Sequence, residues 1–149
     1  MKKWLPILLA MVVHSAHAKW ENYFPAKLSE GISIASHAGH GGFHVFREDY
    51  AFSTGLIYSG EIRPISVAGN QVLSNFLGVD RDDPIFTVKY QNEVKLIEDG
   101  KEYWMPVSYS VVEALQKVKK GGKITAFERL IGVSGGQWIF LLDGFEAAP

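Results

Sequence analysis

Hydrophobic and polar residues alternate along much of the chain after residue 43, and this period of two is typical of half-buried β-strands. The pattern predicts strands over residues 43–46, 55–67, 85–90, 93–98, 102–107, 123–133 and 137–145. Asp99-Gly100 separates two of these runs, and both residue types tolerate the positive φ of a type I′ hairpin turn. We therefore expect residues 85–107 to form a three-stranded meander.

Helical spacing is clearest after residue 109. Ser110 and Glu113 have the separation of a capping box, and apolar residues follow at helical intervals. Lysines 117, 119 and 120 crowd the expected last turn, where the helix dipole favours cations, and Gly121 suits a left-handed stop. The sequence predicts a helix of about three turns here, and a shorter one over residues 72–77.

The resulting order is three strands, a helix and two further strands. This order resembles the OB-fold, a five-stranded Greek-key barrel, over roughly residues 54–145. The resemblance is one of topology and rests on no residue motif, and an SH3-like barrel is the alternative. We expect a mainly β (α+β) protein, a small OB-like or SH3-like closed barrel with one helix before its last two strands.

The N-terminus has the features of a secretory signal peptide. Lys2 and Lys3 precede an apolar run, and Ala16-His17-Ala18 is a small-x-small triplet of the kind that signal peptidase cleaves. The run from Trp4 to Val13 is about half of the roughly 20 residues that span a membrane. We predict that residues 1–18 are removed before Lys19, that residues 19–42 form a flexible lead-in, and that residues 43–149 form one domain in a bacterial periplasm or outside the cell.

Composition narrows the classes further. The chain is 47% hydrophobic and 13% aromatic with a net charge of -1, which excludes a disordered tail and a general nucleic-acid binder. There is no cysteine, so a lipoprotein anchor, a disulfide framework, a Cys nucleophile and a thiolate metal site are all excluded.

Three histidines, His37, His40 and His44, lie within eight residues of a glycine-rich stretch. Imidazoles at this spacing could converge on Zn²⁺ or Cu²⁺, although a fourth ligand is not evident and the spacing matches no compact zinc module. The alternative is a polar loop in which histidine recurs without binding metal. We expect no cofactor and keep a metal-binding protein as the second functional hypothesis.

Residues 132–136, Gly-Val-Ser-Gly-Gly, match the G-x-S-x-G pattern of a hydrolase nucleophile. That motif requires a strand-to-helix turn, whereas strands are predicted on both sides of Ser134, and no histidine lies downstream. A tight hairpin explains these residues better, so a small secreted hydrolase is the least favoured hypothesis and we expect no enzyme.

Alternation directs one aromatic residue away from the expected core. If Tyr103, Met105 and Val107 face inward, Trp104 and Pro106 point outward. We expect a ligand-binding face formed by Trp104, Arg129, Lys89 and Lys101, unless the aromatic residues at 20, 23 and 24 cover Trp104. The sequence thus favours a non-enzymatic envelope module that binds a protein, a peptide or a small polar ligand, with its oligomeric state undetermined.

Overall fold

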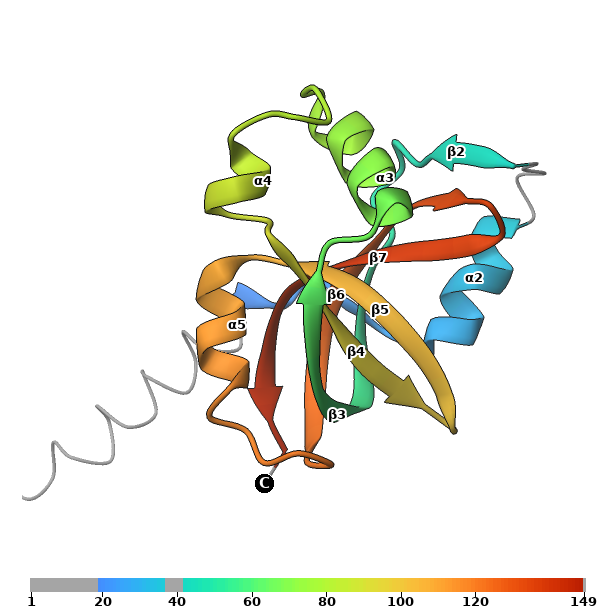
Figure 1. Cartoon of the computed structure of the whole chain (residues 1–149). Coiled ribbons are helices and arrows are strands. Elements are labelled where there is room, and N and C mark those ends of the chain that lie inside the picture. Colours follow the sequence, from blue (N-terminus) through green and yellow to red (C-terminus); the bar gives the residue numbers. More distant parts are fainter. Residues whose placement is uncertain (1–18, 37–41, 149) are drawn as a thin grey trace, which may run out of the picture.

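A computed structural model describes residues 19–36 and 42–148, which form a mostly β structure with a barrel at its centre (Figure 1). Its elements in chain order are β1 (Phe24–Pro25), α2 (Leu28–Ser36), β2 (Phe43–Val45), β3 (Ala51–Pro64), α3 (Val67–Leu77), α4 (Ile85–Val88), β4 (Asn92–Glu98), β5 (Lys101–Val107), α5 (Tyr109–Leu115), β6 (Lys123–Ser134) and β7 (Gln137–Ala147). No helix among the described residues has the length and apolar character needed to cross a membrane.

Five strands close the barrel in the order β3-β4-β5-β7-β6, with β6 pairing back onto β3. The pair β5–β7 is parallel and the other barrel pairs are antiparallel. Helix α5 lies between β5 and β6 in the chain. The prediction of a small closed barrel with one helix before the last two strands is confirmed, and the strand order is that of an OB-like barrel.

Strand β3 is long enough to pair on both sides of the closure. Residues 51–57 pair with β6 and residues 57–64 with β4, with an irregular register between Tyr58 and Ile62. Gly60 lies in this stretch with φ of +84°, a conformation that side-chain-bearing residues rarely adopt. The irregular stretch around Gly60 lies close to the point where the pairing partner of β3 changes from β6 to β4.

The barrel interior is filled by the residues that strand alternation predicted. Val94 and Leu96 of β4 and Met105 and Val107 of β5 are fully buried, and Tyr103 is nearly so. Leu115 of α5 also reaches this core and is fully buried. Burial of this apolar surface is the main stabilising contribution to the barrel.

The expected strand over residues 85–90 is wrong, because Ile85–Val88 form helix α4. Asp83 and Pro84 start this turn: Asp83 Oδ1 accepts a hydrogen bond from the Ile85 amide at 2.9 Å, and Pro84 has helical φ and ψ. The meander therefore consists of β3, β4 and β5, with the predicted positive φ at Asp99 and Gly100.

The expected capping box at Ser110 is also wrong. Helix α5 begins at Tyr109, after an N-cap at Ser108 that makes no side-chain capping bond. The amide of Tyr109 donates to the carbonyl of Lys89 at 2.8 Å, which ties the helix start to the end of α4. The helix ends at Leu115, so it has about two turns and the three lysines follow its end.

The described part of the expected lead-in makes packing contacts with the barrel. Trp20 stacks on Phe127 of β6 with ring centroids 4.3 Å apart, and it lies so close to Gly144 of β7 that a Cβ there would clash. Leu28 of α2 is fully buried. Apolar contacts therefore make residues 19–36 part of the folded unit.

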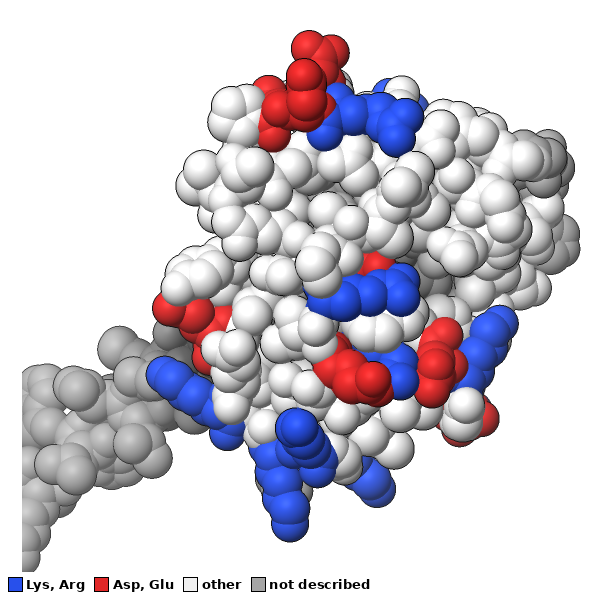
Figure 2. All heavy atoms as spheres, in the orientation of Figure 1, with Lys and Arg blue, Asp and Glu red and all other residues white. Residues whose placement is uncertain are grey.

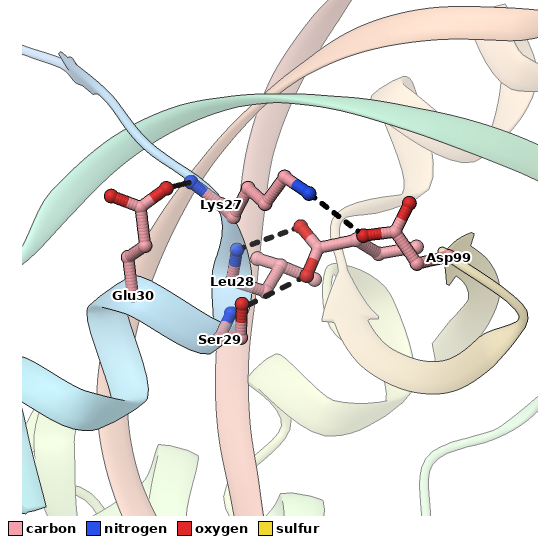
Figure 3. Close-up of polar contacts among 6 residues, drawn as sticks. Lys27, Leu28, Ser29, Glu30 and Asp99 are labelled. Atoms are coloured by element: carbon pink, nitrogen blue, oxygen red, sulfur yellow. Dashed lines mark hydrogen bonds and ion pairs between the residues drawn. The ribbon is translucent and has the colours of Figure 1, made fainter.

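Polar contacts hold the start of α2 (Figure 3). Glu98, at the end of β4, accepts hydrogen bonds from the amides of Leu28 at 2.8 Å and Ser29 at 3.4 Å. Lys27 forms an ion pair with Asp99 of the adjoining turn at 2.9 Å. A carboxylate at the first turn satisfies amides that have no partner within the helix.

Between β3 and β4 the chain makes an excursion, residues 65–91, that carries α3 and α4. These helices lie beyond one end of the barrel (Figure 1) and have their own apolar cluster against β6 and β7. Its buried members are Val72, Leu73, Phe86, Tyr90, Ile131, Ile139 and Leu141. The cluster fixes this excursion beside the turn that joins β6 to β7.

Candidate ligand-binding site

Trp104 lies on the outer face of β5, opposite Lys95 of β4, and is half-buried. The guanidinium of Arg63 covers its ring at 3.9 Å from the ring centroid. Pro106 shares this face but is buried. The aromatic residues near the N-terminus do not account for the burial of Trp104, because Trp20 packs on Phe127 instead.

Two of the residues expected beside Trp104 lie elsewhere. Arg129 of β6 makes two hydrogen bonds to Asp143 of β7, at 2.7 and 2.9 Å, which raise the pKa of the guanidinium. Tyr23 also donates to Asp143. Burial is the main cause of the raised pKa of Tyr23, and this hydrogen bond is the second cause. Asp143 thus links Tyr23 of the N-terminal segment to the barrel, and Arg129 is engaged by the same carboxylate. Lys89 lies over the ring of Tyr90, its own neighbour in the chain.

The histidine hypothesis falls largely outside the described residues. His44 lies on β2, where it pairs with Val133 of β6 and contacts the ring of Phe46. His37 and His40 belong to the residues that the structure does not describe. Within the ranges 19–36 and 42–148, no cluster of three or more potential metal ligands is found, so the metal site stays a prediction.

A pocket of about 220 Å³ lies beside Trp104, and Lys101 is the one other predicted ligand-binding residue that lines it. Its walls come from the end of β3, the start of the 65–91 excursion, strands β4 and β5, and the turn between β6 and β7. The lining residues are Arg63, Ser66, Glu93, Lys101, Glu102, Tyr103, Trp104, Gly136, Gln137, Trp138 and Ile139.

An ion pair organises one wall of the pocket. Arg63 Nε donates to Glu93 Oε1 at 2.6 Å, and Ser66 Oγ donates to Glu93 Oε2 at 3.1 Å. Ser66 is the N-cap of α3 and also accepts from the amide of Gly69. Glu93 is only 1% exposed, whereas the Arg63 side chain is 42% exposed. The network therefore joins the excursion to the strand face and leaves part of the guanidinium at the surface.

Charges of both signs alternate over the outer face of β4 and β5. Figure 2 shows blue and red groups side by side at mid-height, with a largely uncharged surface above them. Lys95 forms ion pairs with Glu61 and Glu102, and the hydrogen bond to Glu61 is the main cause of its raised pKa. A ligand on this face would meet paired charges and an aromatic ring.

A second buried acid lies in the barrel wall, away from this pocket. Glu128 of β6 is fully buried, and desolvation raises its pKa from 4.5 to about 9. Its Oε1 lies 2.5 Å from Thr54 Oγ1, which also contacts the carbonyl oxygen of Ala26 at 2.8 Å. The Thr54 hydroxyl is the donor in both contacts, so Glu128 and the Ala26 carbonyl compete for its single proton.

The turn from β6 to β7 contributes the last wall of the pocket beside Trp104. Gly135 and Gly136 have φ of +55° and +79°, as a tight hairpin requires. Ser134 pairs with Gln137 across this turn and therefore lacks the strand-to-helix context of a hydrolase nucleophile.

Sequence reasoning missed Arg63 and Glu93, the pair that shapes the pocket. They face each other across β3 and β4. Because residues 85–90 were expected to pair with β4, the sequence offered no reason to bring Arg63 near Glu93. A signal that could have found them is their charge complementarity at the ends of two adjacent strands.

No protein-family model matches the sequence, and comparison with curated proteins finds no similar sequence. The fold and the pocket define the molecule as an OB-like barrel with a pocket on the β4–β5 face.

Proposed function

We propose that the protein is a non-enzymatic binding module of the bacterial cell envelope and that it holds part of a protein, peptide or small polar ligand beside Trp104. The observation that carries the proposal is the position of the pocket. OB-like barrels bind ligands on the face of their second and third strands, between the loop joining strands one and two and the loop joining strands four and five. Here these are β4, β5, residues 65–91 and the Gly135-Gly136 turn, and all four contribute to the pocket.

The chemistry of the lining favours binding over catalysis. Glu93 and Glu102 are engaged by Arg63 and Lys95, so these carboxylates serve as partners of neighbouring cations. Trp104 and Trp138 supply the amphipathic aromatic surface that is enriched at binding hot spots.

The size of the pocket suggests that it accepts one portion of a larger ligand. Pockets that enclose small-molecule ligands have volumes of about 300–1,000 Å³. The 220 Å³ beside Trp104 is below that range. A ring or one side chain fits, with the rest of the ligand lying over the β4–β5 face.

Envelope localisation rests on the N-terminal pattern and has support in the fold. Trp20, the second residue after the predicted cleavage site, packs on Phe127 of the barrel. Edman sequencing of the protein from a periplasmic extract should begin at Lys19. A product that retains Met1 and stays in the cytoplasm would contradict this part of the proposal.

Binding can be tested with glycan and random-peptide arrays probed with the protein expressed from its full coding sequence. We expect ligands whose signal falls about tenfold in Trp104→Ala. Tyr109→Ala is the matched control, because Tyr109 is 53% exposed and does not line the pocket. Absence of any ligand on both arrays, or equal loss in both variants, would refute the proposal.

A further inference from the structure

The pocket beside Trp104 lies between two strand edges that do not pair with each other. Strand β5 meets β7 only at Val107–Leu142, although both strands begin several residues earlier. Within the described part of the chain, residues 101–106 of β5 thus have a paired strand only on the β4 side. Residues 101–104 and 136–139 line the pocket from its two sides.

The register of β5 shows which backbone groups point to this open edge. The residues flanking a two-residue turn exchange both backbone hydrogen bonds, so Lys101 bonds to Glu98 across Asp99-Gly100. Alternation then directs the N–H and C=O groups of Glu102 and Trp104 away from β4. Pro106 is in the same phase, and a residue without an N–H is tolerated where the amide would face outward.

Two cations at the pocket retain donors for a ligand. Among the described residues, Arg63 is engaged only through Nε, by Glu93, so its two terminal nitrogens have no acceptor. Trp104 and Glu93 hold the guanidinium plane from two directions. Lys101 has no ion pair within the same described ranges. A fixed guanidinium with two free nitrogens matches the geometry of a carboxylate.

We propose that the ligand is an extended peptide that adds as a strand to the open edge of β5 and places an Asp or Glu side chain against Arg63 and Lys101. This inference rests on the proposed binding function and specifies its ligand. Strand addition gives affinity through main-chain hydrogen bonds, and alternate side chains give specificity. The pocket then takes one acidic side chain of the peptide, in agreement with its small volume.

The edge geometry favours a peptide over an oligosaccharide. Glu102 and Trp104 offer donors and acceptors at the spacing of a strand, which a peptide backbone reproduces and a sugar chain does not. One face of the Trp104 ring is covered by Arg63 and is unavailable for stacking on a sugar.

The experiment selects acidic peptides from the random-peptide array and measures their affinity by calorimetry. We expect that changing the acidic residue to its amide weakens binding about tenfold, because a charge-assisted bidentate contact is lost. Methylation of one main-chain nitrogen that faces β5 should weaken binding about 3- to 10-fold, whereas methylation of the next nitrogen should not. Amide hydrogen exchange at Glu102 and Trp104 should slow in the complex.

Two protein variants complete the design. Arg63→Lys retains the charge beside Glu93, so the variant should fold. It loses the two terminal guanidinium nitrogens that would bind a carboxylate together, so it should bind acidic peptides about tenfold more weakly. Lys101→Gln changes an exposed residue and should weaken the same peptides by a smaller factor. Thermal unfolding of both variants confirms that they remain folded.

The alternative outcomes separate this inference from the binding function. Glycans that bind in a Trp104-dependent way, with no peptide binding, would overturn the peptide inference and retain the binding module. Peptides that bind equally with the amide, or with either main-chain nitrogen methylated, would also overturn it. Failure of all ligands on both arrays would refute the two proposals together.

Discussion

Glu93 and Glu128 are both almost completely buried, but their carboxyl groups have different hydrogen-bond partners. Glu93, at the pocket, has hydrogen bonds from Arg63 and Ser66 to its two oxygens. Glu128, in the barrel wall, contacts only Thr54 through Oε1, and its buried Oε2 has no partner among the described residues.

The difference shows where this small barrel can keep a charge. A buried carboxylate is tolerated when a cation and hydrogen bonds compensate its lost hydration. Arg63 provides that compensation at the pocket, and its own exposed end remains available to a ligand. In the barrel wall, Glu128 has no ion pair with any described residue, and desolvation raises its pKa to about 9, so the acid keeps its proton at neutral pH. The pocket therefore presents a polar group at the surface, whereas Glu128 interacts only within the barrel wall.

The largest expected effect concerns Glu128→Gln, which replaces the neutral acid by a neutral amide of similar shape. The wild type holds a proton at pH 7 that the unfolded chain releases, and this costs stability. Glu128→Gln has no such cost and should be more stable by about 3 kcal/mol at pH 7. Urea unfolding at several pH values measures the difference.

The sign of the pH dependence follows from the raised pKa. Below pH 4.5 both states of the wild type hold the proton, and the contribution of Glu128 to stability is fully present. As pH rises from 4.5 to about 9, the unfolded state binds fewer protons, so wild-type stability falls by up to about 1.4 kcal/mol per pH unit relative to Glu128→Gln. Parallel stability curves for the two proteins would show that Glu128 is ionised in the folded state.

Arg63→Met tests the opposite case, a buried carboxylate that loses its cation. We expect a loss of about 2 kcal/mol, reduced by the partial exposure of Arg63. The double variant Arg63→Met/Glu93→Gln should recover most of it, because no unpaired charge remains. Equal losses in the single and double variants, measured by urea unfolding, would mean that Arg63 acts through packing on Trp104 alone.

Thr54→Val removes the hydroxyl that donates to Glu128 and should cost about 1.5 kcal/mol. Thr54 donates to Glu128, and this bond lowers the pKa of Glu128, so its loss should raise that pKa further. Urea unfolding at several pH values up to about 9 measures both the loss of stability and the rise in the pKa of Glu128. A Thr54→Val protein with wild-type stability and an unchanged pH profile would exclude a stabilising hydrogen bond from Thr54 to Glu128.

Ser66→Ala is the smaller counterpart at the pocket. The hydroxyl caps α3 and donates to Glu93, so its loss should cost about 1 kcal/mol. Ser108→Ala is the matched control, because Ser108 is the N-cap of α5 but makes no capping bond. Equal thermal shifts in the two variants would argue against a special role for the Ser66 contact.

Strand alternation and turn chemistry were sufficient to predict most of the barrel. The runs around Leu96, Met105 and Ile124 have a period of two and form β4, β5 and β6. The error at residues 85–90 arose because a short apolar run has no distinguishing period, and Asp83-Pro84 decided in favour of a helix. The packing of residues 19–36 depends on distant partners such as Phe127, which local patterns do not reveal.

The pocket was predictable only in part. Alternation correctly placed Trp104 on the outer face, but it could not show which strands lie beside β5 in the closed barrel. Arg129 was expected near Trp104, yet its bonds to Asp143 place it with the N-terminal segment. Arg63 and Glu93 depend on the pairing of β3 with β4 across the 65–91 excursion, which the sequence near either residue does not indicate.

The most direct test of the account is an NMR titration of the isotope-labelled protein with the tightest ligand from the arrays. We predict that the resonances of the Arg63 side chain, Trp104 and Gln137 shift together, while those of Thr54 and Glu128 remain unchanged. Shifts centred on Thr54 and Glu128, with the Trp104 resonances unmoved, would contradict the assignment of the pocket as the binding site.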